Sequence, residues 1–515
     1  MSIPILSFKS SDTLRNFNLK GLFRSRSTIS SDDRQTISQY LKDAEEDARR
    51  CEVEAKKLLA AMKTLENRKK GLEKSMEMYR SLLSPVHKLP SEILSNIFGL
   101  CCEDNELSYD LDSPEVMNLS MVCGRWRDLV LSTPTLWSTL RLEASCFRTR
   151  RPTRELDTSL AEMVKLFLER SKNTPLKLAF QSYINQPVEP SFSAFDLLVS
   201  EMERWSDITF GSGGFLERLP TRRHLPMLKH LCLPYAPMAH TDNFSNSPAL
   251  VSVELTPHLH GDVVLPWDRI KILTLSESNA ADSLSVLSRC SGLEKLEFVS
   301  TEIDGTEEVI GPITFPRLQS LSFYSFRPEI LPIFQFARFP HLSTLIFSGH
   351  VIDSDGWEDP RVLPSVQGLL QSQCTITSLT LVRQQMDDHQ ALALLKLLPA
   401  LQSLEVREYL GNAIVTPHFL KWLTVEDGSL SESSSILPRL STLTLDVYDK
   451  GLDAEAFSNA VVSRWKPAPD HRVECLQSVD ITVRASGDEA NWRQLVWLED
   501  FRAAGLRFTH TLIQL

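Results

Sequence analysis

Apolar residues recur along this chain at three different spacings, and each spacing predicts a different structure. Between residues 41 and 83 they alternate at intervals of three and four, the pattern of a helix with one continuous apolar seam. Lys69 interrupts this seam, and Ser84-Pro85 ends it. We predict a long coiled-coil helix that either self-associates through residues 41–83 or folds back onto its own chain. The third possibility is a single helix surrounded by solvent, which would require the heptad pattern to be accidental. The seam consists of Leu41, Ala44, Ala48, Cys51, Ala55, Leu58, Met62, Leu65, Leu72, Met76, Tyr79 and Leu83.

The second spacing is the 3.6-residue period of short amphipathic helices, and it covers residues 89–137. Three short helices are predicted. The first follows Leu89-Pro90, and the second follows Ser113-Pro114-Glu115, where Ser113 can cap and Pro114 suits the first turn. Gly124 loosens the link to the third, a last turn with Trp126, Leu129 and Val130 that ends at Pro134. The acidic insert between them is predicted to be a surface loop. Helices of this size cannot bury all their apolar residues against one another, so a partner is expected to cover some. The predicted core residues are Leu119, Val122, Cys123, Trp126 and Trp137.

The third spacing is the pattern L-x-x-L-x-L, which recurs from residue 228 onward at intervals of 20 to 39 residues. Leucines two residues apart predict strands that bury one face, and helical patterns lie between the copies. A degenerate copy at 137–142 overlaps the short helices, so the two regions are expected to share a core. A final helix, Asn491–Ala504, is predicted to cap the open end. The clear copies are Leu228–Leu233, Leu250–Leu255, Ile270–Leu275, Leu293–Phe298, Leu318–Phe323, Leu342–Phe347, Ile376–Leu381, Leu401–Val406, Leu440–Leu445 and Leu476–Ile481.

Charge and composition narrow the class of partner. The net charge of −11 and a pI near 5.7 argue against nucleic acid as the main partner. No apolar run approaches the ~20 residues that span a bilayer, so no membrane association is expected. The nine cysteines include no CxxC pair, which favours reduced core thiols in a cytoplasmic or nuclear protein. Residues 1–33 are predicted to be a disordered tail, with a transit peptide as the alternative.

Motifs that carry chemistry are missing from the sequence. The one dense glycine run, Gly211–Gly214, lacks the lysine of a phosphate-binding loop. The sequence contains no His-Glu-x-x-His, Gly-x-Ser-x-Gly or paired-cysteine metal pattern, and its twelve histidines are scattered. We therefore expect no catalytic residues, no metal ligands and no cofactor, and we interpret the chain as a non-enzyme.

The region of short helices resembles an F-box, in the F-box-like form common in fungal proteins. The resemblance implies that a Skp-family adaptor binds Leu89, Pro90, Ile93, Leu94, Ile97 and Phe98. The insert between Cys102 and Glu115 is longer than the compact family pattern, which puts the shape of the partner surface in doubt. The residues that carry the resemblance are Leu89-Pro90, Glu92-Ile93-Leu94, Ile97-Phe98, Leu119, Val122-Cys123, Trp126-Arg127 and Thr133-Pro134-Thr135-Leu136-Trp137.

The later region looks like a leucine-rich-repeat solenoid, with parallel strands inside and helices outside. An ordinary doubly wound sheet would need longer crossovers and a phosphate-binding glycine turn. The expected fold class is α/β. The expected domains are a disordered tail (1–33), a coiled-coil helix (34–84), an F-box-like domain (85–137) and a leucine-rich-repeat-like solenoid with a capping helix (138–515).

These resemblances imply a substrate-receptor subunit of an SCF-type cullin–RING ubiquitin ligase, in which the repeats hold an unknown target protein for ubiquitin-dependent degradation. The alternative is a non-ligase interaction scaffold built from the coiled coil and the repeats. Residues between and just after the repeat leucines are predicted to face the target, and acids outnumber bases there, which favours a basic or hydrogen-bonding segment. An exposed strand suits short polar residues for its own reasons, which is the competing interpretation. The charged and aromatic candidates are Glu254, Glu297, Tyr324, Glu405, Arg407, Asp446 and Asp480.

Overall fold

A computed structural model of the chain shows two compact units, residues 1–94 and residues 95–515. None of its helices, among the residues described, is both long and apolar enough to cross a membrane. The predicted tail falls mostly outside the described residues, and the predicted capping helix at 491–504 falls wholly outside them. The structure describes residues 23–24, 28–108, 113–143, 154–181, 193–211, 213–216, 218–233, 242–256, 263–276, 280–299, 313–324, 337–349, 357, 359–370, 374–409, 413–425, 437–448, 452–467, 473–485 and 505–514.

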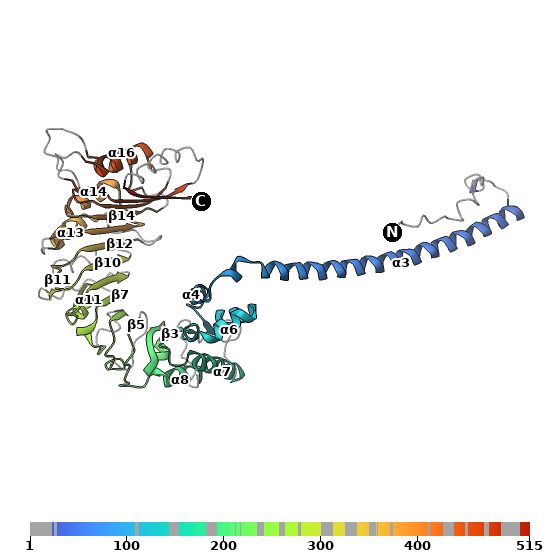
Figure 1. The fold of residues 1–515 in the computed structure, drawn as a ribbon, viewed down its shortest axis with the longest axis horizontal. Helices are drawn as coiled ribbons and strands as arrows, with labels where there is room; N and C mark the ends of the chain where they lie inside the picture. Colours follow the sequence, from blue (N-terminus) through green and yellow to red (C-terminus); the bar gives the residue numbers. More distant parts are fainter. Residues whose placement is uncertain are drawn as a thin grey trace. The chain divides into compact units, whose positions relative to one another are not determined.

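The first unit is dominated by one helix, α3 (Ser31–Leu82), of 52 residues (Figure 1). Its start is capped by Ser30, whose side chain accepts a hydrogen bond from the Asp33 amide at 3.1 Å. The helix ends just before Pro85, which opens the short 3-10 helix η1 (Pro85–Lys88). The predicted long helix is therefore present and starts a few residues earlier than expected. Helix α4 (Ser91–Cys101) begins in this unit and continues into the second.

The second unit is built on one 15-stranded sheet, in which each strand pairs in parallel with the strand of this sheet that follows it in the chain. This order never reverses, unlike that of a doubly wound sheet. Figure 1 shows helices such as α11 and α13 along one side of these strands. The strands are β1 (Glu106–Ser108), β2 (Thr139–Glu143), β3 (Leu176–Gln181), β4 (Trp205–Phe210), β5 (His230–Leu233), β6 (Ser252–Leu255), β7 (Ile272–Ser276), β8 (Lys295–Val299), β10 (Ser320–Tyr324), β12 (Thr344–Ser348), β13 (Ser378–Val382), β14 (Ser403–Arg407), β15 (Thr442–Tyr448), β16 (Ser478–Ala485) and β17 (Arg507–Gln514).

The helices of the second unit connect these strands. They are α5 (Glu115–Val122), α6 (Gly124–Ser132), η2 (Pro134–Trp137), α7 (Arg154–Ser171), α8 (Ser193–Ser200), η3 (Met202–Arg204), α9 (Gly213–Leu216), η4 (Trp267–Arg269), α11 (Ala280–Leu287), α13 (Val362–Leu370), α14 (Asp388–Lys396), α15 (Pro417–Leu423) and α16 (Ala454–Trp465). A separate pair of short strands, β9 (Ile313–Thr314) and β11 (Ala337–Arg338), stands outside the main sheet.

Each complete L-x-x-L-x-L copy ends in a strand, which confirms the strand predictions, and the register aligns the leucines. The chain of paired residues Leu231–Val253–Leu273–Leu296–Leu321–Leu345 crosses six strands, and all of these side chains are buried. One ladder position carries Phe298, Phe323 and Phe347, whose rings stack with centroids 5.4 Å apart at each step. Because every strand places its leucines in register with its neighbours, a local two-residue period becomes one continuous core.

The acidic insert differs from its prediction. Residues 106–108 are not a loop but strand β1, which pairs with β2 at the edge of the sheet. Strand β2 in turn pairs with β3, and Trp137 packs its ring against Phe167 of α7 with centroids 5.1 Å apart. The region of short helices and the sheet therefore share one core, as the overlap at residues 137–142 predicted.

Candidate functional site

Helix α4 presents a row of apolar side chains to solvent. Ile93, Ile97 and Leu100 follow one another at intervals of four and three residues and are 46%, 40% and 70% exposed. Pro90, just before the helix, is also exposed, and Leu89 is partly exposed. Leu100 was not among the predicted adaptor-binding residues, although the same helical period would have included it. An exposed apolar row of this kind is the usual mark of a protein-binding surface.

Two residues predicted to contact the adaptor lie in the interior instead. Leu94 and Phe98 are each only 1% exposed, and the Phe98 ring packs against Trp126 with centroids 4.7 Å apart. The prediction that these two side chains bind the adaptor is therefore wrong for this structure. The physical reason is the helical period itself, since Leu94 and Phe98 sit one position after the exposed Ile93 and Ile97 and so point to the other side.

The three predicted short helices are present as α4, α5 and α6, but the predicted core of this region needs correction. Helix α5 ends at Val122, Cys123 is extended with φ −159° and ψ 169°, and α6 starts at Gly124. Residues on either side of this break do not share a face. Val122 is 59% exposed, Leu119, Cys123 and Trp126 are half-buried, and of the predicted core only Trp137 is buried. The buried side chains of α5, α6 and η2 include those of Val116, Val130 and Leu136.

Asn105, which the sequence analysis passed over, joins the parts of this region. It is fully buried, and its Nδ2 donates to the carbonyl oxygens of Cys102, Leu136 and Thr139 at 3.1, 3.0 and 3.1 Å. Its Oδ1 accepts from the Val116 amide at 3.2 Å. One side chain thus connects the end of α4, the start of α5, η2 and β2. The insert that looked like a surface loop carries the residue that organises the module.

The same region also holds a buried thiol and an ion pair. Burial, with charge from Cys101 and Glu115, raises the pKa of Cys102 to about 12, so this thiol is not a nucleophile at neutral pH. Cys101 beside it is exposed, as is Cys475, so the expectation that the cysteines lie in the core holds only in part. Arg141 pairs with Asp104 at 2.6 Å and ties the insert to β2.

These features meet in the segment from η1 to β2. The family model for F-box-like domains matches residues 86–143. The chain carries an F-box-like domain there, and β1 and β2 belong to it. A search of the curated proteins finds no match to the chain. An F-box-like domain is a protein–protein interaction module, so the exposed row on α4 lies in a segment whose general role is to bind a partner protein.

The outward positions of the later strands carry the predicted target-binding residues, but most of the acids are neutralised. Lys295 pairs with Glu297 at 2.7 Å, and Arg407 donates to Glu405 at 2.6 Å. Arg484 holds Asp446 through two hydrogen bonds of 2.7 and 2.8 Å. Arg484 was not among the predicted residues, because only strand pairing brings β15 and β16 together. The net negative charge of this face is thus smaller than the number of its acidic residues suggested.

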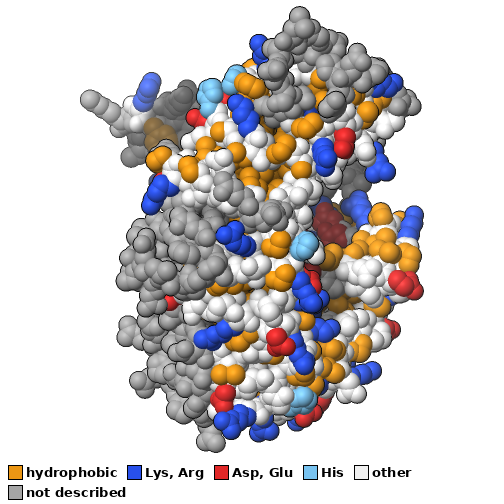
Figure 2. Space-filling view, turned by 90° about the vertical axis from the view of Figure 1, so that its left-hand side faces the viewer, with side chains coloured by type: hydrophobic (Ala, Val, Ile, Leu, Met, Phe, Trp, Pro, Cys, Tyr) orange, Lys and Arg blue, Asp and Glu red, His pale blue; other side chains and the backbone are white. Residues whose placement is uncertain are grey.

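The other candidates on these strands vary in their surroundings. Glu254 accepts hydrogen bonds from Cys232 at 3.2 Å and from Ser276 at 3.3 Å. Tyr324 is 41% exposed and Asp480 is exposed, so both are accessible. Ser322, on the same ladder, is fully buried, so the face is not open along its whole length. Figure 2 views the molecule from the side where α11 and α13 lie in Figure 1. On that side, apolar side chains and charges of both signs are interspersed.

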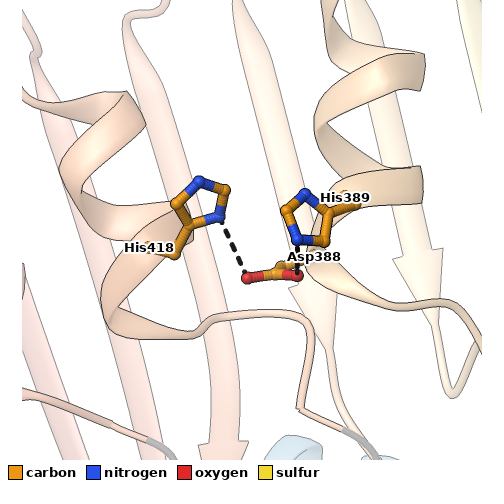
Figure 3. A group of neighbouring side chains, drawn as sticks. All are labelled: Asp388, His389 and His418. Atoms are coloured by element: carbon orange, nitrogen blue, oxygen red, sulfur yellow. Dashed lines mark hydrogen bonds and ion pairs between the residues drawn. The ribbon is translucent and has the colours of Figure 1, made fainter.

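A group with metal-ligand atoms, Asp388, His389 and His418, lies where α14 and α15 begin (Figure 3). Nδ1 of His418 lies 3.2 Å from Asp388 Oδ2, and Nε2 of His389 lies 3.9 Å from Asp388 Oδ1. The indole N–H of Trp422 donates to Nε2 of His418 at 2.9 Å, so in neutral His418 the proton sits on Nδ1 and points at Asp388. Thr416 also donates to Asp388, at 2.6 Å.

The hydrogen bonds engage both ring nitrogens of His418 and one carboxylate oxygen of Asp388, and we interpret them as a clamp between two helix starts. Burial alone would raise the pKa of Asp388, but the hydrogen bonds from Thr416 and His418 and the nearby histidines lower it. No sequence motif indicated this group, because its two histidines are 29 residues apart in the chain.

Two buried charges in the second unit also have structural partners. Glu408 accepts hydrogen bonds from the amides of Val415 and Tyr448, while burial raises its pKa. Arg464 donates to the carbonyl oxygens of Leu423 and Leu437, and burial lowers its pKa to about 10. Both groups satisfy the backbone where loops meet helices, which is the expected use of a buried charge outside a catalytic site.

Proposed function

We propose that this chain is a substrate-receptor subunit of an SCF-type cullin–RING ubiquitin ligase. The observation that carries the proposal is the F-box-like match at residues 86–143, within which α4 exposes Ile93, Ile97 and Leu100. A Skp-family adaptor would cover this apolar row. Because these side chains are already partly buried in the free chain, covering what remains exposed contributes about 2–5 kcal/mol of gross hydrophobic free energy, enough to be the centre of an interface.

The chain itself would supply proximity and no chemistry. By holding a target protein near the ubiquitin carrier bound to the cullin, it raises the effective concentration of the two reactants. The absence of catalytic motifs from the sequence supports this assignment, as do the structural partners of Glu408 and Arg464. We place this activity in the cytoplasm or nucleus, where such ligases act.

The target would bind the sheet of the second unit, which we propose to be a leucine-rich-repeat-like solenoid. Its support is the sequential order of parallel strands, one for each L-x-x-L-x-L copy. The accessible candidates are Tyr324 and Asp480, together with the paired charges on β14 and β15. Because Arg407 and Arg484 balance acids there, a hydrogen-bonding segment fits this face better than a strongly basic one.

The second candidate is a non-ligase scaffold. The observation that favours it is the apolar seam of α3, whose large side chains are exposed and suit self-association through residues 41–83. A scaffold of this kind would bind partners through the coiled coil and the sheet, without a cullin.

Co-purification distinguishes the two functions. The tagged full-length chain should retain a Skp-family adaptor and a cullin, identified by mass spectrometry. Ile93→Ala combined with Ile97→Ala should lower adaptor recovery by about tenfold, since covering the exposed part of each side chain contributes about 1 kcal/mol. Met227→Ala is the matched control, because Met227 is 42% exposed and lies outside the F-box-like domain. Recovery of neither adaptor nor cullin by the wild-type chain would favour the scaffold.

A further inference from the structure

The seam of α3 is the longest exposed apolar feature of the chain among its described residues. Leu58, Leu65 and Leu72 are 57%, 67% and 58% exposed, and Tyr79 is 69% exposed. Exposed leucines at heptad spacing are unfavourable in water unless another surface covers them. The side-chain sizes of the seam residues and the charges that flank them indicate which surface that is.

Side-chain size divides the seam into two halves. The first half holds the small residues Ala44, Ala48, Cys51 and Ala55, and the second half holds Leu65, Lys69, Leu72 and Met76. In a parallel pair, equal positions face each other, so three alanine layers would leave the helices under-packed and Lys69 would face Lys69. In an antiparallel pair centred on residue 60, every small residue faces a large one.

Four of the six antiparallel layers therefore pair a small residue with a large one. Ala48 faces Leu72 of the other copy, Ala55 faces Leu65, and Cys51 takes the place opposite Lys69. The complete set of layers is Leu41–Tyr79, Ala44–Met76, Ala48–Leu72, Cys51–Lys69, Ala55–Leu65 and Leu58–Met62. Layers that alternate small and large residues interdigitate at native packing density, which a parallel alignment of this sequence cannot achieve.

The charges that flank the seam favour the same orientation. Antiparallel pairing brings Glu54 beside Arg68 of the other copy and Glu45 beside Arg80, and the two-fold axis repeats both contacts. Its one like-charge contact is Glu52 with Glu73. Parallel pairing would keep only one attractive contact and would bring acids together near residues 47 and 52.

We propose that α3 pairs with α3 of a second copy in antiparallel orientation. This arrangement deepens the proposed self-association of residues 41–83 and does not depend on adaptor binding. At 1.5 Å per residue, the paired segment 41–79 is about 57 Å long, so the two copies leave the coiled coil at ends about 57 Å apart. The dimer would hold two F-box-like domains apart at opposite ends of a rod.

Charge reversal tests the orientation. Sedimentation analysis of the full chain should show a concentration-dependent dimer. Arg68→Glu and Glu54→Arg should each raise the dimer dissociation constant by about tenfold, because each turns the symmetric attractive contacts into repulsive ones. The double variant Glu54→Arg/Arg68→Glu should restore pairing. Lys74→Glu is the control, since it makes the same charge change on the solvent side of the heptad.

The outcomes separate the alternatives. Restoration by the double variant supports the antiparallel dimer, because in a parallel pair Glu54 and Arg68 do not meet. A double variant as weak as Arg68→Glu alone would overturn it. A wild-type chain that stays monomeric would also overturn it and would leave the seam for another surface of this chain. Circular dichroism checks that each variant keeps its helix, and adaptor recovery by the same variants reports separately on the F-box-like domain.

Discussion

Replacing Asn105 by alanine should destabilise the F-box-like domain more than any single change on its surface. The substitution removes the contacts of Nδ2 with three carbonyl oxygens, which share its two amide hydrogens, and one hydrogen bond accepted by Oδ1, all at 3.0 to 3.2 Å. Each is worth about 1 kcal/mol net, and buried carbonyls left without a donor add to the loss. We therefore expect the free energy of unfolding to fall by about 3–5 kcal/mol, a large share of the stability of a typical domain.

Denaturant unfolding of the full chain, followed through tryptophan fluorescence, measures this loss, and limited proteolysis locates it to residues 86–143. Asn105→Asp is the sharper variant, because its carboxylate still accepts from the Val116 amide but faces three carbonyl oxygens. It should destabilise the domain at least as much as alanine does. If both variants unfold like the wild type, Asn105 is not the connection between α4, α5, η2 and β2, and the account of this domain fails.

Three further predictions concern other parts of the structure. Trp137→Ala should cost about 3–5 kcal/mol, as large-to-small changes in a packed core do, whereas the half-buried Trp126→Ala should cost less; equal losses would contradict the corrected core. The pKa of Asp388 is lower in the folded chain than its unfolded value near 3.8, so the ionised carboxylate stabilises the fold at pH values above 3.8. This stabilisation is lost as the pH falls through the lower pKa of the folded state. Asp388→Asn should thus lower stability by about 1 kcal/mol at neutral pH, and a difference that persists in strong acid would refute this. Asp446→Lys should reduce target recovery, because the target is proposed to bind the strand face that carries Asp446. Adding Arg484→Glu should restore the local ion pair. If Asp446→Lys leaves target recovery unchanged, the target binds a different surface.

Much of the fold was accessible from the sequence because its signals are local. The heptads of residues 41–83 predicted α3, and each L-x-x-L-x-L copy predicted a strand, since both periods reflect which side chains one element turns inward. The order Leu-Pro, Ile-Phe, Val-Cys, Trp-Arg and Leu-Trp identified the F-box-like region that the family model matches. None of these inferences required knowing what lies next to the element.

The errors arose where a contact partner decides the outcome. Phe98 and Ile97 are equally apolar, and only the packing of α4 determined which of them is buried. The extended backbone at Cys123 divides what looked like one apolar face. Asn105 and Arg484 gained their roles from carbonyls and acids that lie far away in the chain, or on a neighbouring strand. Periodicity along one element shows which side chains share a face, but burial and charge pairing depend on distances between elements, and only the tertiary structure sets those distances.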